Sequence, residues 1–259
     1  MATHHVTFDP RQTVHITLIG VGGTGSLILT HLVRLDQAIR ALGGKGLFVH
    51  AIDPDTVSVT NLTRQNFAPA DVGRNKAITL VERCNLYAGL SWQASPRLCT
   101  STDFERTQHV VITCVDSGAS RLQIRDAMRG HEHRVHYWLD CGNEAHTGQV
   151  VLGQLNGNDQ TRLPTILDRD PTGMHGDEPD APSCSAAEAL TRQHLFINPE
   201  IALRAAQLLG ELLLHAQTNT CATFVNLAAQ TRAVAVNVRG RQRNALKTLV
   251  PLLEYRTAH

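Results

Sequence analysis

The sequence predicts an α/β fold with a Rossmann-like, doubly wound and mostly parallel sheet. Short apolar runs of strand length alternate with segments of helical periodicity, which is the pattern of a parallel sheet covered by helices. The first unit combines an apolar run at residues 14–19, glycines at 20–25 and an amphipathic segment at 27–35. Two later runs, at 221–228 and 233–238, are separated only by a short turn, so we expect antiparallel strands to extend the sheet.

The remaining elements follow from local patterns. Further buried-type strands are expected at residues 47–52, 110–115, 135–139 and 150–155. Helices are expected at 71–84, 119–128 and 199–216. The last of these is apolar around most of its circumference, so we expect it to be buried on more than one side. Asp71 is interpreted as the cap of the helix that it begins.

Composition and charge exclude several classes of protein. With 259 residues, 42% of them hydrophobic and 18% charged, the chain is globular and long enough to bury a large core. Its net charge of +1 gives no reason to expect nucleic-acid binding. The first residues lack a signal pattern, and no apolar run reaches the ~20 residues of a membrane span. We therefore expect a cytoplasmic protein that binds neither nucleic acid nor membrane.

Four glycines, Gly20, Gly22, Gly23 and Gly25, lie between the first strand and the helix that follows it. Glycine lets a backbone approach a ligand closely, and the unpaired amides of a helix N-terminus favour anions. Asp53 follows the second strand, where a carboxylate can accept hydrogen bonds from ribose hydroxyls. The arrangement predicts a nucleotide site. The alternative is that the glycines only allow close packing of helix and sheet.

Two cations distinguish this site from a nicotinamide site, which needs only the loop and the acid. They are Arg64 and Lys76, and no Lys-Ser or Lys-Thr closes the glycine loop as in a Walker A motif. An arginine fork and a lysine charge can hold a triphosphate and neutralise it during transfer. Each could instead be a solvated loop charge. Lys76, however, opposes the dipole at a helix start, so local stability does not explain it.

Further motifs follow the glycines in order and at compatible spacing. They are Asp53-x-Asp55, Asn61-Leu62-x-Arg64-Gln65, Gly73-x-x-Lys76 and Val115-Asp116-Ser117. Over about residues 14–155, this pattern resembles the ThiF/MoeB/HesA family of adenylating enzymes, which are related to ubiquitin activation. The resemblance implies that ATP binds at these residues, that Asn61 and Gln65 orient phosphate or metal-bound water, and that the protein is a homodimer.

Asp116 stands at the carboxyl end of the strand at 110–115, where open α/β sheets place their ligands. The resemblance implies that Asp116 binds magnesium, and a hard carboxylate near phosphate oxygens suits that ion. The alternative is that Asp116 caps the helix at 119–128, since Asp116-Ser117-Gly118 could serve as a cap. The position at the end of a strand favours the metal role.

Residues 156–185 are rich in Gly, Asn, Asp and Pro, and such a long polar run is typical of a functional loop. In the resembled family this segment is a crossover loop that covers the acceptor's C-terminal tail and can carry a nucleophilic cysteine. Cys184 is either such a nucleophile, favoured as a thiolate near an expected helix start, or an ordinary free cysteine. The stretch 181–185, with Gln193 and Asn198, most resembles the ThiF-type proteins of the bacterial PRTRC gene system.

We expect a single adenylation domain over residues 1–259. It would contain a nucleotide-binding core at 13–155, the crossover loop at 156–185, and a C-terminal helix with strands at 186–259. The expected candidate catalytic residues are Arg64, Lys76, Asp116 and Cys184.

The expected activity is ATP-dependent adenylation of a C-terminal carboxylate, with Mg²⁺. The acceptor would be a ubiquitin-like or sulfur-carrier-like protein with an exposed tail, and a thioester on Cys184 would follow. One alternative is a scaffold that binds the partner without chemistry, because the family's N-terminal arginine and its paired-cysteine zinc site have no counterpart here. The other is an NAD-dependent oxidoreductase, which would leave Arg64, Lys76 and Asp116 without a role.

Overall fold

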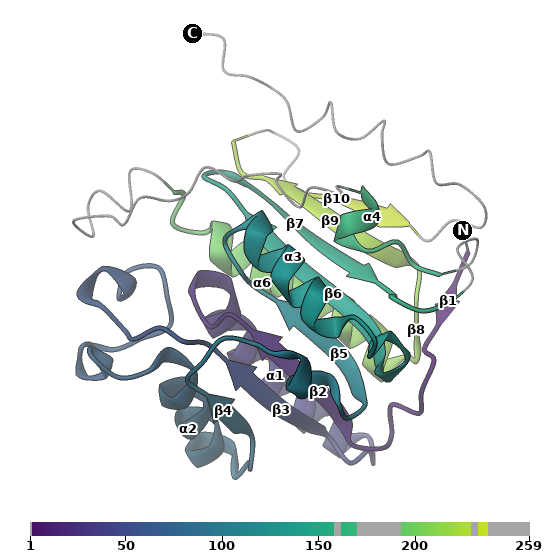
Figure 1. Ribbon diagram of the computed structural model, residues 1–259, viewed down its shortest axis with the longest axis horizontal. Helices are drawn as coiled ribbons and strands as arrows, with labels where there is room; N and C mark the ends of the chain where they lie inside the picture. The colour runs from purple at the N-terminus through teal and green to yellow at the C-terminus, as the bar shows by residue number, and fades with distance from the viewer. Residues whose placement is uncertain (1, 158–161, 170–192, 229–232, 238–259) are drawn as a thin grey trace, which may run out of the picture.

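An eight-stranded sheet forms the centre of the computed structural model, which describes residues 2–157, 162–169, 193–228 and 233–237 (Figure 1). The strand order is β10-β9-β7-β6-β5-β2-β3-β4. In chain order these strands are β2 (Val14–Ile19), β3 (Leu47–Ile52), β4 (Gln93–Ser95), β5 (Gln108–Thr113), β6 (Val135–Asn143), β7 (Thr147–Gly153), β9 (Thr220–Asn226) and β10 (Ala233–Asn237). A separate short pair joins β1 (His4–His5) to β8 (Gln217–Thr218). The five neighbouring strands β4, β3, β2, β5 and β6 pair in parallel. Strands β7, β9 and β10 continue the sheet in antiparallel pairing, as predicted.

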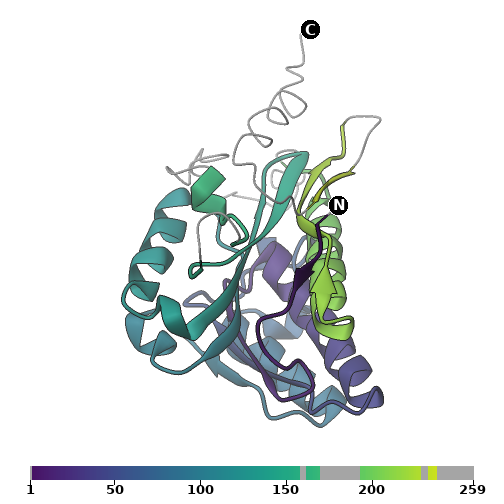
Figure 2. The ribbon, with the colours of Figure 1, turned by 90° about the vertical axis from the view of Figure 1, so that its right-hand side faces the viewer.

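Helices cover both faces of the sheet (Figures 1 and 2). They are α1 (Gly23–Ala41), α2 (Lys76–Ala88), α3 (Gly118–Met128), α4 (Ile166–Arg169) and α6 (Ile197–Leu214). Helices α1, α2 and α6 lie on one face and α3 and α4 on the other, which makes the sheet doubly wound. None of the helices in the described ranges combines the length and the apolar character needed to cross a membrane.

Burial explains the apolar runs of the central strands. Val110, Val111 and Ile112 in β5 are all fully buried, as expected for a parallel strand covered on both faces. Helix α6 packs along α1 and also touches β6 and β7. Its expected burial on more than one side is therefore confirmed. The packing of α6 along α1 also places the start of α6 next to the glycine loop.

The second predicted helix begins at Lys76, and the prediction that Asp71 caps it was wrong. The cap is Asn75, whose Oδ1 accepts a hydrogen bond of 3.0 Å from an amide in the first turn. Asp71 instead ends a short 3₁₀ helix (Pro69–Asp71). Gly73 then takes a φ of +87°, which interrupts helical geometry, so the helix starts at the next available cap.

Three histidine rings form a row at the amino ends of neighbouring strands, beneath Phe8 of the N-terminal arm. His15 and His109 lie 5.7 Å apart between ring centroids, and His109 and His136 lie 5.5 Å apart. The His15 amide donates a hydrogen bond of 2.9 Å to Nδ1 of His109, so this nitrogen carries no proton. Burial, with the adjoining His136 and His15 rings, lowers the pKa of His109 to about 4.

Acid should destabilise the protein through His109. Its folded-state pKa lies near 4, below the ordinary value of 6.5, so the unfolded chain binds more protons between these values and stability falls as the pH drops through them. We expect the free energy of unfolding to fall by about 1 kcal/mol from pH 7 to pH 5. The fall stays this small because solvent reaches part of the ring and weakens the effect of the pKa shift. Denaturant unfolding at both pH values measures this change.

Two substitutions identify the source of the pH dependence. His109→Gln should reduce it, whereas His133→Gln, in the exposed turn before β6, should leave it unchanged. The same pH response in His109→Gln as in the wild type would contradict the assignment.

Candidate active site

The predicted glycines, Asp53 and Asp116 lie at the carboxyl ends of β2, β3 and β5. Strand β2 lies between β3 and β5, and the helices that follow β2 and β5 cover opposite faces, so a crevice opens outside these strand ends. The glycine loop joins β2 to α1, Asp53 follows β3, and Asp116 lies between β5 and α3. In open α/β sheets, ligands bind at such a reversal of strand order.

The four glycines have different tasks. Gly20 has a φ of +87°, and a Cβ there would lie 2.5 Å from the Cys114 carbonyl oxygen. A Cβ on Gly25 would collide with the Gly20 carbonyl, and one on Gly23 would lie 2.6 Å from the Asn198 side chain. Only at Gly22 of these four positions does the added atom meet open space. Gly20, Gly23 and Gly25 therefore shape the loop, and Gly22 is the point where a ligand can approach the backbone.

Asp53 fixes the glycine loop to the end of β3. Its Oδ2 accepts a hydrogen bond of 2.5 Å from the Val21 amide, and its Oδ1 accepts one of 2.8 Å from the Asp55 amide. The side chain is buried, and this burial raises the pKa of Asp53 despite the two amide bonds. Asp53 thus has a structural task within the site, and its contact with ribose stays a prediction.

Contacts of Asp55 and Asn75 hold Lys76 at the site. Its Nζ lies 2.9 Å from Oδ2 of Asp55, and most of the lysine is buried. The Asn75 side-chain amide donates hydrogen bonds to the backbone carbonyls of Asp53 and Asp55, at 2.8 and 2.9 Å. The start of α2 is therefore tied to the end of β3, and this tie places the ammonium group beside the crevice.

Arg64 and Gln65 contain buried polar atoms that have no partner among the described residues. Nη1 of Arg64 donates a hydrogen bond of 2.6 Å to Oε1 of Gln193, but Nε of Arg64 has no partner among the described residues. Oε1 of Gln65 is likewise buried and unbonded within the described part of the chain. Buried unsatisfied groups are costly and cluster where a ligand completes them. Asn61, by contrast, is used locally, because its Oδ1 accepts a hydrogen bond from the Ser58 amide.

A polar network that sequence reasoning left without a role connects Arg64 to the glycine loop. Asn198 donates a hydrogen bond of 3.4 Å to the same Gln193 oxygen that accepts from Arg64. The Thr24 hydroxyl lies 3.1 Å from Oδ1 of Asn198 and 3.2 Å from Oδ1 of Asn143. Gln193 and Asn198 were visible as part of a family motif, whereas no sequence signal marked Thr24 or Asn143.

Asp116 is not the cap of α3. The cap is Ser117, whose Oγ accepts a hydrogen bond of 3.1 Å from the Ser120 amide. Asp116 makes no hydrogen bond or ion pair with any residue that the structure describes. Its exposed carboxylate is therefore available at the strand end. Cys184, the stretch 181–185 and most of the expected crossover loop lie outside the described residues.

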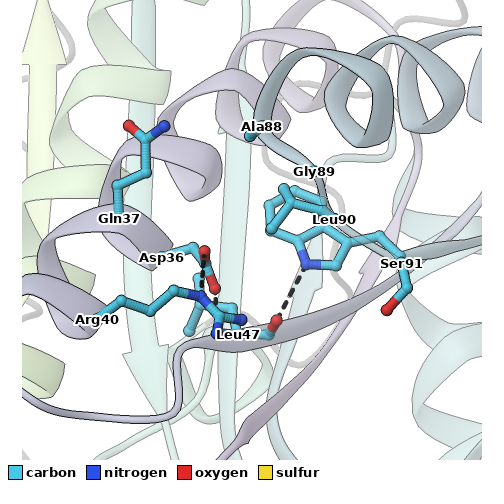
Figure 3. A pocket seen from close by; sticks show the side chains of 9 residues that line it. Asp36, Gln37, Arg40, Leu47, Ala88, Gly89, Leu90 and Ser91 are labelled. Carbon is cyan, nitrogen blue, oxygen red and sulfur yellow. Dashed lines mark hydrogen bonds and ion pairs between the residues drawn. The ribbon is translucent and has the colours of Figure 1, made fainter.

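A separate cavity of about 260 Å³ lies between α1, the end of α2 and the start of β3, away from the strand ends that form the site (Figure 3). It is lined by Asp36, Gln37, Arg40, Leu47, Ala88, Gly89, Leu90, Ser91 and Trp92. Asp36 accepts hydrogen bonds from the Leu47 amide at 2.6 Å and from Nε of Arg40 at 2.8 Å, and Trp92 donates one to the Leu47 carbonyl. In the described residues that line it, no buried polar side-chain atom lacks a partner, so the cavity gives no sign of a ligand.

Comparison with known proteins gives one family and several similar folds. The model of the ThiF family matches residues 10–247. E. coli MccB, solved with ATP, covers 91% of this chain and 66% of its own at 16% identity, with a TM-score of 0.59. The same protein solved with selenomethionine MccA covers 90% and 66% at 18% identity, with a TM-score of 0.59. PaaA covers 87% and 64% at 14% identity, with a TM-score of 0.57. The chain thus spans about two thirds of the length of these proteins, and the likeness concerns the fold.

Proposed function

The chain belongs to the ThiF family, and from this premise we propose that it is an adenylyltransferase, which uses ATP to activate a C-terminal carboxylate. The observation that carries the proposal is the buried Nε of Arg64, which lacks a partner beside an equally unsatisfied Gln65 oxygen within the described residues. A phosphate oxygen can accept a hydrogen bond from Nε of Arg64, and a water molecule bound to the phosphate can donate one to Oε1 of Gln65. A nicotinamide cofactor would leave Arg64, Lys76 and Asp116 without a task.

In the proposed reaction, a carboxylate oxygen of the acceptor attacks the α-phosphorus of ATP. A bond forms between these atoms, the bond from the α-phosphorus to the bridging oxygen breaks, and pyrophosphate leaves with that oxygen. Arg64 and Lys76 would neutralise the charge that develops on the phosphate oxygens. Asp116 would hold the magnesium ion, which supplies further positive charge there. Gly22 would allow the phosphates to approach the backbone, and Asp53 would contact the ribose.

The acceptor is proposed to be a polypeptide. MccB has been solved with ATP and with MccA, and selenomethionine labelling marks MccA as a polypeptide. We propose more narrowly a ubiquitin-like or sulfur-carrier-like protein with an exposed C-terminal tail, bound by a cytoplasmic homodimer. The family motif at 181–185, Gln193 and Asn198 supports a protein of the PRTRC type.

Binding of ATP with magnesium, beside binding of NAD, tests the proposal by calorimetry on the full chain. We expect magnesium-dependent binding of ATP and none of NAD. Asp116→Ala should weaken magnesium-dependent ATP binding by about tenfold, while Asp126→Ala, an exposed carboxylate on α3, serves as the matched control. Binding of NAD alone would overturn the proposal, and binding of neither nucleotide would favour a non-catalytic scaffold.

Cys184 is proposed to receive the activated acyl group. Its thiolate would attack the carbonyl carbon of the acyl-adenylate, and AMP would leave as the thioester forms. Cys184→Ala should therefore retain ATP–pyrophosphate exchange with the acceptor but lose a conjugate that thiols cleave, as seen by gel electrophoresis. A wild-type protein that never forms such a conjugate would show that Cys184 is an ordinary cysteine.

A further inference from the structure

Arg169, the last residue of α4, carries a buried guanidinium without a counter-ion among the residues that the structure describes. Its Nη2 donates a weak hydrogen bond of 3.6 Å to Sγ of Cys221. Both Nε and Nη1 are buried, and neither has a partner in the described ranges. The guanidinium carbon lies 5.8 Å from the centre of the Phe224 ring. Within the described residues, the direct contacts of this cation are a thiol and an aromatic ring, which leave its burial costly, so a complementary anion is expected.

The neighbouring carboxylate does not supply that anion. Asp168 accepts hydrogen bonds of 2.6 and 2.7 Å from both terminal nitrogens of Arg162. Its Oδ2 also accepts a hydrogen bond of 2.8 Å from the Thr165 amide at the start of α4. The charge of Asp168 is therefore largely compensated by Arg162, and within the described residues Asp168 acts on Arg169 only through space, without a hydrogen bond or an ion pair between them. Two donors of the Arg169 guanidinium remain for a ligand.

The position of Arg169 relates it to the candidate active site. Helix α4 lies on the sheet face that α3 also covers, over the antiparallel strands (Figures 1 and 2). Cys221 precedes Ala222, which pairs with Val151 of β7, and Val151 in turn pairs with Asp140 of β6. Asp140 pairs with Thr113, the last residue of β5, so Cys221, which Arg169 contacts, lies three strands from β5 and one residue below the end of that strand. These offsets correspond to about 14 Å across the sheet and about 3 Å along it, or about 15 Å in all.

We propose that Arg169 binds a carboxylate side chain of the acceptor, about five residues before its reacting C-terminus. An extended chain covers about 15 Å in four to five residues, so an acceptor whose end lies at the nucleotide would pass this point. The planar fork of arginine matches a carboxylate, and Phe224 supports its flat face. The inference rests on the proposed function in one respect, namely that the acceptor is a polypeptide.

Synthetic octapeptides test the site directly. They carry a fluorophore at the N-terminus and a free C-terminal carboxylate, are otherwise uncharged, and contain one glutamate at a varied position. Fluorescence anisotropy with the full chain should show about tenfold tighter binding for glutamate than for glutamine four to six residues before the terminus. Arg169→Met should abolish the preference, and Arg169→Glu should transfer it to a lysine peptide. Arg129→Met, an exposed arginine on the same face, should leave it intact.

Equal affinity for the glutamate and glutamine peptides, or no binding of either, would overturn the proposal. A second measurement asks whether this chain already neutralises Arg169. If the guanidinium is uncompensated, Arg169→Met should raise the thermal midpoint of the free protein by a few degrees. A lowered midpoint would show that a carboxylate of the chain pairs with Arg169, and this would also overturn the proposal.

ATP binding distinguishes a failure of the proposed function from a failure of the carboxylate site at Arg169. ATP binding by calorimetry should be the same in Arg169→Met as in the wild type, because Arg169 lies far from the nucleotide. A protein that shows the glutamate preference without binding ATP would contradict the adenylation proposal and still support a carboxylate site at Arg169.

Discussion

Replacing Arg64 by alanine should lower ATP–pyrophosphate exchange by about a hundredfold or more, because one fixed cation at a transferring phosphate has an effect of that size. The fold should survive, since in the described structure the Arg64 side chain makes its hydrogen bond to Gln193 and its Nε is unbonded. Exchange is measured with the acceptor, and a thermal melt checks folding. Exchange at the wild-type rate in a folded Arg64→Ala protein would refute the assigned role.

Gln193→Glu tests the same cation without removing it. The substitution places a carboxylate where Oε1 of Gln193 now lies, 2.6 Å from Nη1 of Arg64. An ion pair would then compete with the phosphate for the guanidinium, so we expect the KM for ATP to rise about tenfold. Gln207→Glu is the matched control, because Nη1 of Arg204 donates to Gln207 in the same way on the exposed side of α6.

The sequence predicted the part of the site that lies at strand ends. Parallel strands end at one edge of a sheet, so Asp53 after β3, Asp116 after β5 and the glycines after β2 had to approach one another. The same reasoning predicted the sheet itself, because the apolar runs and the helical periods between them were both strong. The hairpin of β9 and β10 was also predicted correctly from its short turn.

Contacts between distant segments could not be predicted in this way. Thr24 and Asn198 are 174 positions apart, and no periodicity relates them, although their contact determines why Gly23 must lack a side chain. The start of α2 was misplaced because Asp71 and Asn75 are both good caps, and only the turn at Gly73 decides between them. No sequence pattern likewise distinguished Arg169 from the other arginines, whereas its burial in the structure does.

Arg121→Leu should lower the free energy of unfolding by about 3–5 kcal/mol, because it leaves the buried carboxylate of Asp140 without its counter-charge. Nε of Arg121 lies 3.1 and 3.2 Å from the two oxygens of Asp140, and both side chains are almost fully buried. Burial raises the pKa of Asp140, and Arg121 is the main opposing influence. Without Arg121 this pKa should rise further above its unfolded value.

The pH dependence of that variant follows from the sign of this change. A folded-state pKa above the unfolded value gives stability that is present at low pH and is lost as the pH rises through the folded-state pKa. The destabilisation by Arg121→Leu should therefore be smaller at pH 5 than at pH 8 in denaturant unfolding. An equal loss at both values would indicate that Asp140 stays charged or that packing, rather than charge, is responsible.

The double variant Arg121→Leu with Asp140→Leu separates stability from positioning. Replacing a buried ion pair by apolar residues of similar volume is often neutral, so most of the lost stability should return. Nη2 of Arg121, however, also donates a hydrogen bond of 3.1 Å to the carbonyl of Val115, the residue before Asp116. The double variant should therefore fold normally yet bind ATP with magnesium more weakly, by about tenfold, because the turn that carries Asp116 is no longer held. Wild-type ATP affinity in that protein would show that the ion pair serves the core alone, and weak affinity would show that the buried pair and the site form one structure.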